Sequence, residues 1–406
     1  MFAPAFVPMN NPEAIVNGKL ALAFLNNGYE LDVISKLNET DYNYSSKIDE
    51  IWIPLKERSI FIDLPKYRGI TKYLDYTYCF LITGHLIQGC RWALKAYQTS
   101  LHLVKTNKYD VILSRAMPDC AHLPALLLAR HTGIPWIANW NDPHDEKAPH
   151  PWGKIKKFSF FRNKFNTSVI KNADWHTFPS EKLRVYMSNY LAAEVLERSS
   201  VIEHIAIDFN GNHSRDLEYF DICYAGALYT GRDPSSFLKC IEELRNENVS
   251  FKRYVRLFFI GKFGDWLFEI IKRSRLDNIT NIIAPMSYME SLEFMSKMTL
   301  LFLLETNYTQ GIFCPSKIVD YYQLSKPIIA IGAKGSEVEE ILHKFGGGVY
   351  IAHNENKLLK NKLVELFSLW QANKLGTVVE NSNLKAKFSP EIIVEKYDAL
   401  FKTLKS

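Results

Sequence analysis

The chain has 406 residues, 47% of them hydrophobic and 13% aromatic, which is enough to form two ordinary domains with substantial cores. Its formal net charge of +5 is too weak to indicate a nucleic-acid-binding protein, and is compatible with an anionic substrate or an anionic membrane surface. No stretch approaches the roughly 20 apolar residues of a membrane span, and no secretory signal is visible. The six cysteines include no C-x-x-C pair, so we expect buried thiols in a reducing, cytoplasmic compartment.

The N-terminal residues predict the strand, helix and strand that begin a doubly wound domain. Residues 2–7 have the pattern of a short strand and residues 31–35 that of a second one, with a helix between them from Pro12 to Asn26. Asn11 is the expected N-cap of this helix, and the proline suits its first turn. Glu13 lies in the same turn, where a carboxylate interacts favourably with the helix dipole.

Two further predicted strands end in polar loops. Residues 111–114 are followed by Arg115, and residues 135–138 by a loop that contains Asp142 and His144. Open α/β sheets bind ligands at the carboxyl ends of their strands, so these side chains are candidates for a binding site. The aspartate and the histidine could orient a substrate hydroxyl or take its proton. An Asx turn before a proline, beside a solvated histidine, explains the same residues equally well.

A basic and aromatic segment follows. Residues 147–173 contain seven Lys or Arg and five Trp or Phe, but no acidic residue. On a helix, one face would carry Phe158, Phe161, Phe165 and Val169, and a stripe beside it Lys157, Lys164 and Lys171. This pattern is typical of a basic amphipathic helix on an anionic membrane, here from Gly153 to Lys171. It is also typical of a surface helix whose apolar face packs on its own sheet.

The second half of the chain repeats the alternation of strands and helices. After a polar run over residues 208–215, which is the best candidate for a linker, strands are expected at 220–224, 255–260, 282–283, 300–304 and 328–331. Helices are expected at 234–246, 290–297, 317–324 and 390–404. The alternation predicts an α/β protein with two doubly wound domains, over residues 1–205 and 206–388, and a C-terminal helix over residues 389–406.

Residues 312–331, IFCPSKIVDYYQLSKPIIAI, combine a turn, a helix start, a short helix and a buried strand. Ser316 is the expected N-cap, and Pro327 ends the helix before the apolar strand. The amide groups at a helix N-terminus can receive a phosphate, and Lys317 lies beside them. An ordinary helix–strand unit of a parallel sheet explains the segment as well.

The segment from 315 to 342, PSKIVDYYQLSKPIIAIGAKGSEVEEIL, resembles the donor-nucleotide segment of glycosyltransferase family 4. Residues 221–234 are similar to the strand and Gly-rich turn that open the C-terminal domain of such enzymes, and residues 109–143 to part of their N-terminal half. The resemblance implies a GT-B fold, with two Rossmann-like domains and a cleft between them. It also implies retaining transfer of a sugar from a nucleotide-sugar donor to a glycan or lipid-linked acceptor, as in bacterial surface polysaccharide synthesis.

The resemblance assigns roles to residues already noted. It implies a donor site of Gly226, Arg232, Gly261, Lys262, Pro315, Ser316, Lys317 and Asp320, with the Asp320 carboxylate holding ribose hydroxyls. It implies an acceptor site of Asn11, Glu13, Arg115, Asp142 and His144, with Arg232, Lys317 and Asp142 as the catalytic residues. The chain has no Asp-x-Asp, so we expect cationic side chains to stabilise the diphosphate without a metal, and no cofactor besides the nucleotide sugar.

Two positions depart from the family pattern. Ile312 occupies the place of the first of two acidic residues, and Ala227 that of the usual arginine after the first C-terminal-domain glycine, which leaves Arg232 as its stand-in. These losses keep open a non-catalytic GT-B subunit of a polysaccharide assembly complex. A GT-B nucleotide-sugar epimerase is the other alternative.

Overall fold

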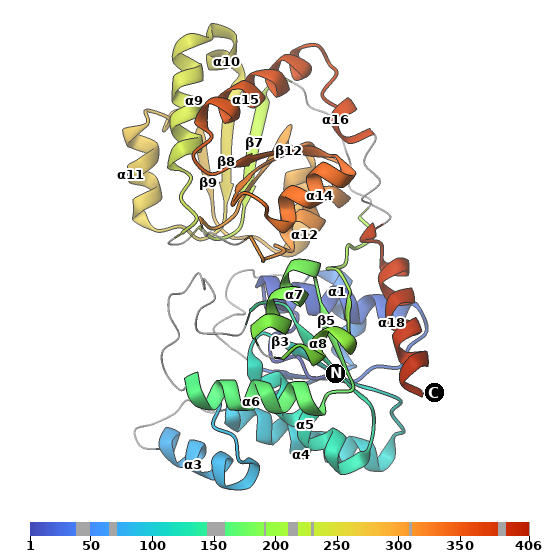
Figure 1. Cartoon of the computed structure of the whole chain (residues 1–406). Helices are drawn as coiled ribbons and strands as arrows, with labels where there is room; N and C mark the ends of the chain where they lie inside the picture. The colour runs from blue at the N-terminus through green and yellow to red at the C-terminus, as the bar shows by residue number, and fades with distance from the viewer. Residues whose placement is uncertain are drawn as a thin grey trace. The chain divides into compact units, whose positions relative to one another are not determined.

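The computed structural model describes residues 1–37, 49–64, 71–143, 159–190, 192–209, 218–228, 231–307, 311–380 and 387–405. The chain divides into two compact units, which are described separately (Figure 1). Unit 1 contains Met1–Ile205 and Pro390–Ser406, and unit 2 contains Ala206–Ser389. Each unit is built around a parallel β-sheet.

The sheet of unit 1 is parallel throughout. It contains β3 (Ile112–Ala116), β4 (Trp136–Trp140), β5 (Trp175–Phe178) and β6 (Ser199–Val201), in that order, and the pair β1 (Val33–Lys36) and β2 (Ser59–Ile62). Phe2 joins the two groups, because it bridges to Ile34 on one side and to Ser114 on the other. The predicted strand over residues 2–7 is therefore wrong beyond this bridge. Pro4 and Pro8 have no N–H to donate to a neighbouring strand.

The helices of unit 1 are α1 (Pro12–Asn26), α2 (Ile53–Lys56), α3 (Thr71–Thr83), α4 (Cys90–Thr106), α5 (His122–Thr132), α6 (Ser159–Asn172), α7 (Glu181–Tyr190), α8 (Glu194–Glu197) and α18 (Pro390–Lys405). The prediction for α1 is confirmed, including its cap, since the Asn11 Oδ1 accepts a hydrogen bond from the Ala14 N–H at 2.9 Å. In Figure 1, α18 lies beside α1, and the Tyr397 ring packs edge-on against Phe24 with centroids 5.2 Å apart.

The aromatic face of α6 is part of the protein core. Phe165 and Val169 are both fully buried among the side chains of unit 1. The burial of these two side chains favours the interpretation of residues 159–172 as a surface helix whose apolar face packs on its own domain. Among the described helices, none combines the length and apolar character that a bilayer crossing requires. All six cysteines are buried and none forms a disulfide, as expected from their spacing.

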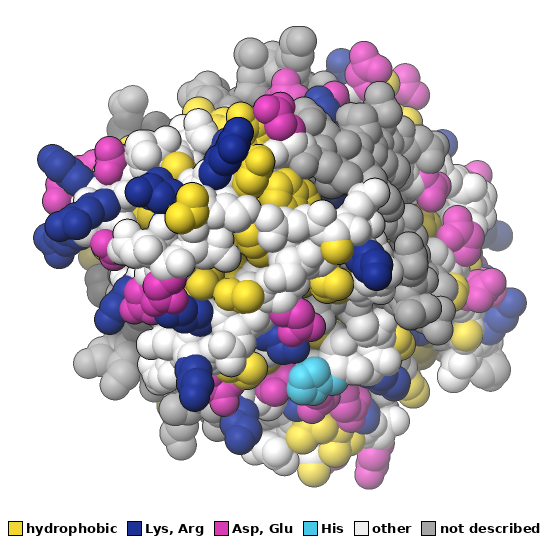
Figure 2. Space-filling view, turned by 90° about the horizontal axis from the view of Figure 1, so that it is seen from above, with side chains coloured by type: hydrophobic (Ala, Val, Ile, Leu, Met, Phe, Trp, Pro, Cys, Tyr) yellow, Lys and Arg dark blue, Asp and Glu magenta, His cyan; other side chains and the backbone are white. Residues whose placement is uncertain are grey.

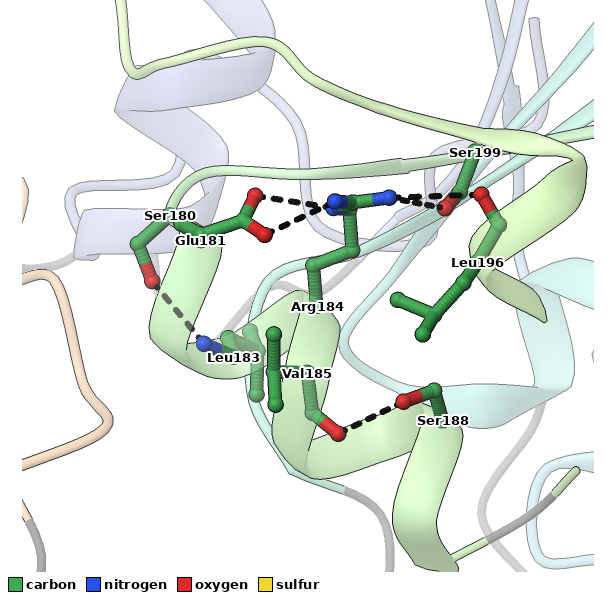
Figure 3. Close-up of polar contacts among 8 residues, drawn as sticks. All are labelled: Ser180, Glu181, Leu183, Arg184, Val185, Ser188, Leu196 and Ser199. Carbon is green, nitrogen blue, oxygen red and sulfur yellow. Dashed lines mark hydrogen bonds and ion pairs between the residues drawn. The ribbon is translucent and has the colours of Figure 1, made fainter. Parts of the chain in front are cut away.

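Figure 3 shows how the start of α7 is fixed after β5. The Ser180 hydroxyl accepts a hydrogen bond from the Leu183 N–H at 3.2 Å, which caps the N-terminus of the helix. The Arg184 guanidinium donates to both carboxylate oxygens of Glu181, at 2.7 and 2.8 Å, and to the Leu196 carbonyl at 3.3 Å. These bonds tie α7 to the segment that leads into β6.

The sheet of unit 2 has the order β12-β11-β10-β7-β8-β9, and all its strands are parallel. The strands are β7 (Phe220–Ala225), β8 (Val255–Ile260), β9 (Thr280–Ile283), β10 (Leu300–Leu304), β11 (Ile328–Gly332) and β12 (Gly348–Ala352). This is the strand order of a doubly wound Rossmann fold, in which the direction of winding reverses between β7 and β10.

Helices complete unit 2 as α9 (Ser235–Glu247), α10 (Val249–Tyr254), α11 (Asp265–Arg273), α12 (Tyr288–Ser296), α13 (Lys317–Gln323), α14 (Glu337–Phe345), α15 (Asn356–Gln371) and α16 (Thr377–Glu380). Its central strands are buried on both faces, as their continuous apolar runs predict. Phe237 of α9 stacks on Phe302 of β10 with ring centroids 4.1 Å apart.

Candidate functional site

One candidate site is the point in unit 2 where β7 and β10 lie side by side. Their pairing register places Leu300 opposite Ile222. Because both strands run in the same direction, the chain leaves both at one edge of the sheet, through Gly226 after β7 and Glu305 after β10. Ligands of doubly wound folds bind outside this edge, at the switch point of the strand order.

Lys317 reaches this switch point from the start of α13. Its Nζ donates to the Tyr224 hydroxyl at 3.1 Å and lies 4.3 Å from the centroid of the same ring. Gly226 makes the approach possible, because its φ is +115° and a Cβ there would lie 2.5 Å from Nζ. Burial, together with repulsion from Arg232, lowers the pKa of Lys317 well below its ordinary value. A bound anion would favour the protonated amine again.

Two more predicted cations lie near the ends of neighbouring strands. Arg232 is half-buried, and its charge acts on both Lys317 and the Glu305 carboxyl. Lys262 is exposed and follows β8, immediately after Gly261. A Cβ on that glycine would lie 2.5 Å from the carbonyl oxygen of Gly226, so the two glycine turns pack directly on each other. The structure thus brings Gly226, Gly261, Arg232 and Lys317 to one edge of the sheet.

Glu305 is a buried carboxyl that the sequence did not reveal as part of the site. It is 6% exposed and lies 2.8 Å from the Tyr350 hydroxyl, which also lies 2.7 Å from the Ala333 carbonyl oxygen. Burial raises the pKa of Glu305 to about 7, against the opposing influence of hydrogen bonds from Ser336 and Tyr350 and of the Arg232 charge. A Cβ on Gly332 would lie 2.1 Å from the Glu305 Oε2, so only glycine fits beside the pair.

The start of α13 differs from its prediction. Ser316 occupies the N-cap position but has helical backbone angles, and its side chain makes no capping hydrogen bond. Its predicted capping role is therefore wrong: the Ser316 carbonyl instead accepts from the Val319 N–H at 3.1 Å. The helix has only seven residues, so the neighbouring cations would attract an anion more strongly than its dipole.

Asp320 lies one turn further along α13 and is held by a polar chain. Its Oδ1 accepts a hydrogen bond from the Tyr288 hydroxyl at 2.7 Å, and that hydroxyl in turn accepts from the Gln323 amide at 3.2 Å. The Gln323 Oε1 accepts from the Ile207 N–H at 3.0 Å. Asp320 also interacts electrostatically with Lys317. Pro315 and the buried Ile312 precede this helix.

A separate candidate site lies in unit 1, where α1 begins beside the carboxyl ends of β3 and β4. The Asn141 amide donates to the Glu13 carboxylate at 2.6 Å. Burial raises the pKa of Glu13 to about 8, and the nearby charge of Asp142 raises it further, whereas that of Arg115 opposes the shift. Glu13, Arg115 and Asp142 are thus brought together, as predicted residues of one site. Asn141 joins them as a residue that the sequence analysis did not single out.

Arg115 is buried and makes internal contacts. Its Nε donates to the Asn17 Oδ1 at 2.7 Å, and its Nη1 to the Tyr397 hydroxyl at 3.2 Å. Both partners belong to helices, α1 and α18, so the arginine connects them to β3. Asn11 serves as the cap of α1.

The strand β4 is longer than predicted. Asn139 and Trp140 continue it and do not belong to the loop, and both side chains donate hydrogen bonds to the neighbouring strand β5. The Asn139 amide donates to the Thr177 hydroxyl at 3.1 Å, and the Trp140 indole to His176 at 3.2 Å. The polar loop is thereby confined to residues from Asn141 onward.

Some predicted residues fall outside the described part of the chain. They are His144 of the acceptor site, Gly153, Lys157 and Phe158 of the basic and aromatic segment, and residues 210–215 of the predicted linker. Lys164 and Lys171 lie on α6 and are exposed. The signals that could have found Glu305 and Asn141 are positional, since each directly follows a run of buried strand residues.

The comparisons with known proteins concern the fold of the chain and the type of protein it resembles. No protein-family model matches the sequence. A probable glycosyltransferase of Pseudomonas aeruginosa, WbjE, is 24% identical over 346 residues, which cover 79% of this chain and 82% of the relative. The structure of Anabaena HepE in complex with UDP and glucose matches with a TM-score of 0.63 at 13% identity, over 96% of this chain and 95% of that one. Sucrose-phosphate synthase from Thermosynechococcus elongatus matches with a TM-score of 0.67 at 11% identity, over 97% and 94% of the two chains.

The two structural likenesses extend over nearly the whole chain, and together with the similarity to the probable glycosyltransferase they confirm the resemblance and the fold class that the sequence predicts. This chain has the GT-B fold of nucleotide-sugar glycosyltransferases.

Proposed function

We propose that this protein is a retaining, metal-independent glycosyltransferase that moves a sugar from a nucleotide-sugar donor to a glycan or lipid-linked acceptor in bacterial surface polysaccharide synthesis. The observation that carries the proposal is the position of Lys317 and Arg232 at the switch point of the unit 2 sheet. The similarity to a probable glycosyltransferase supports the type of reaction.

The donor side of the reaction needs positive charge. When the bond between the anomeric carbon and the phosphate oxygen breaks, its electron pair stays on the phosphate, and the diphosphate gains charge. Lys317 and Arg232 would stabilise this charge, with Lys262 as a third cation. Since repulsion from the arginine contributes to the lowered pKa of Lys317, a diphosphate between the two cations would relieve it. Asp320, held by Tyr288, would accept hydrogen bonds from ribose hydroxyls.

On the acceptor side, we propose that unit 1 orients the hydroxyl that receives the sugar. Its oxygen would bond to the anomeric carbon on the face that the phosphate leaves, and its proton would pass to the departing phosphate oxygen. This order of events retains the anomeric configuration. Asp142 would orient the hydroxyl, with Asn11, Glu13, Arg115 and His144 as further acceptor contacts.

The proposal includes peripheral contact with an anionic membrane, where a lipid-linked acceptor would be found. The exposed Lys164 and Lys171 of α6 support it, because each basic residue near an anionic surface contributes about 1 kcal/mol. Replacing Lys157, Lys164 and Lys171 by Gln should weaken salt-sensitive binding to anionic vesicles and leave the fold intact.

The decisive experiment measures turnover of a panel of nucleotide sugars with lipid-linked acceptors, with and without a metal chelator. Lys317→Ala should lower kcat about 100- to 1000-fold, because the lost charge acts most strongly on the departing diphosphate. Asp320→Asn should mainly weaken donor binding, because ribose contacts are the same before and during bond cleavage. Lys297→Ala, on the exposed end of α12, is the matched control and should turn over normally.

Each alternative gives a different result. Nucleotide released only in the presence of an acceptor, and unaffected by the chelator, supports the proposal. Interconversion of nucleotide sugars without an acceptor would identify an epimerase. If the parent turns over no donor, or if Lys317→Ala is fully active, the non-catalytic subunit becomes the better interpretation.

A further inference from the structure

One helix of unit 1 turns a broad apolar face to the solvent. On α3, Leu81 is 76% exposed and Tyr73 67%, and the remaining exposed members of this face are Leu74, Tyr78, Phe80 and Ile82. Most of them follow the spacing of one helical stripe, whereas Cys79 on the other side is fully buried in the core. A soluble monomer normally exposes such residues singly, and a contiguous apolar patch indicates an interaction surface.

The apolar face continues onto the start of α6. Phe80 of α3 packs edge-on against Phe161 with ring centroids 6.0 Å apart, and Phe161 packs in the same way on Phe160 at 5.5 Å. Phe160 is itself 72% exposed. We name the exposed residues Tyr73, Leu74, Tyr78, Phe80, Leu81, Ile82 and Phe160 the α3–α6 surface.

Most of the charged side chains around this surface are basic, and two of them, Arg91 and Arg162, form ion pairs with Asp75 and Asp119. Helices α3, α4 and α6 together contain seven Lys or Arg and a single acidic residue, Asp75, whereas the whole chain has a net charge of only +5. Asp75 lies 3.6 Å from the Arg91 guanidinium, which balances its charge. Lys95 of α4 and Lys164 of α6 are exposed. The face in Figure 2, by contrast, intersperses Lys and Arg with Asp and Glu.

We infer that the α3–α6 surface inserts into the headgroup region of a bilayer that contains anionic phospholipids. Exposed Tyr, Phe, Leu and Ile side chains bordered by cations are what an interfacial helix presents to such a bilayer. A second copy of the chain is a poorer occupant, because a symmetric dimer through this surface would bring two sets of basic helices together. The inference rests on the membrane contact proposed above and assigns that contact to residues on α3, since the Phe165 and Val169 face of α6 is buried.

The test measures binding of the full chain to vesicles of phosphatidylcholine with and without phosphatidylglycerol. Leu81→Gln combined with Ile82→Gln should lower partitioning into the anionic vesicles about 100-fold, because two apolar side chains no longer enter the bilayer. Both positions are exposed, so the thermal midpoint should not fall. Val249→Gln on α10, which is 85% exposed, is the matched control and should bind like the parent.

Stronger binding to the anionic vesicles, lost in the α3 variant and kept in the control, supports the inference. Equal binding of variant and parent would overturn the assignment of the membrane contact to the α3–α6 surface, but not the contact itself. A parent that transfers sugar but ignores both kinds of vesicle would overturn the contact and the surface, but not the transferase. A dimer that sedimentation shows to dissociate in the α3 variant would assign the surface to self-association and overturn the inference.

Discussion

Gly226 lies directly against the end of the Lys317 side chain, so that a Cβ on residue 226 would come within 2.5 Å of Nζ and 2.6 Å of Cε. Gly226→Ala should therefore displace the lysine from Tyr224 and reduce turnover about 100-fold, in addition to straining the backbone at φ +115°. Gly335→Ala is the control, because its φ is also positive, at +73°, but nothing lies within 4 Å of the new Cβ. It should lose about 1 kcal/mol of stability and keep its activity.

Comparing the two variants distinguishes backbone strain at residue 226 from displacement of the Lys317 amine. Steady-state kinetics and urea unfolding of both variants would be measured together. If Gly226→Ala loses only as much stability as Gly335→Ala and keeps the parent's kcat, the position of Lys317 has no part in turnover.

Binding of a nucleoside diphosphate should raise the pKa of Lys317 and so favour its protonated form. Burial and the Arg232 charge lower the pKa of the free lysine, and an anion beside it raises the pKa again. Calorimetric titrations in two buffers of different ionisation enthalpy measure the number of protons taken up. Lys317→Arg keeps the charge at every pH, so its uptake should vanish even if it still binds. Equal uptake by the parent and this variant would refute the role of the lysine.

Many of the strands and helices could be predicted from short-range sequence patterns. The bounds of β8 and β10 could be predicted because each is a continuous apolar run, and those of α1 because Asn11 and the proline after it define its start. The strand predicted over residues 2–7 failed because a single bridge, at Phe2, satisfies the sheet there. Apolar composition alone does not reveal where pairing ends.

The candidate site residues could likewise be predicted only where a local sequence motif contains them. Lys317 could be identified because it lies within one local motif, but the environment of Glu305 depends on Tyr350, which is 45 residues away in the chain. Burial raises the pKa of Glu305, and the residues near it in the sequence do not predict this burial. The Glu13–Asn141 contact likewise joins residues 128 apart. Long-range partners of this kind require the fold.

Glu305 should make the parent less stable as the pH rises. Its folded pKa of about 7 lies above the ordinary value of 4.5, so the folded state holds the extra proton between these values. The contribution to stability is complete below pH 4.5 and is lost as the pH rises through 7. The full cost above that range is about 3 kcal/mol. Glu305→Gln is neutral at every pH and should remove this part of the dependence.

Urea unfolding of parent and Glu305→Gln at a series of pH values provides the measurement. The variant should gain on the parent as the pH rises from 5 to 8, within the window set by the pKa shift of Glu305. Tyr350→Phe is the companion variant, because it removes one hydrogen bond and keeps the carboxyl. A parallel pair of curves for parent and Glu305→Gln would show that this carboxyl is not the titrating group.

Glu13 offers the corresponding experiment on the acceptor side. Burial raises its pKa to about 8, so at neutral pH the carboxyl is mostly protonated and can donate a hydrogen bond to an acceptor oxygen. The acceptor KM of the parent should therefore rise as the pH passes 8. Glu13→Gln keeps a neutral donor and should lose this dependence, whereas Glu13→Ala should have the raised KM at every pH. Asn11→Ser preserves the cap of α1 and tests whether acceptor binding needs only the cap or the Asn11 amide itself. If the parent and Glu13→Ala have the same acceptor kinetics, Glu13 has only a structural role at the start of the helix.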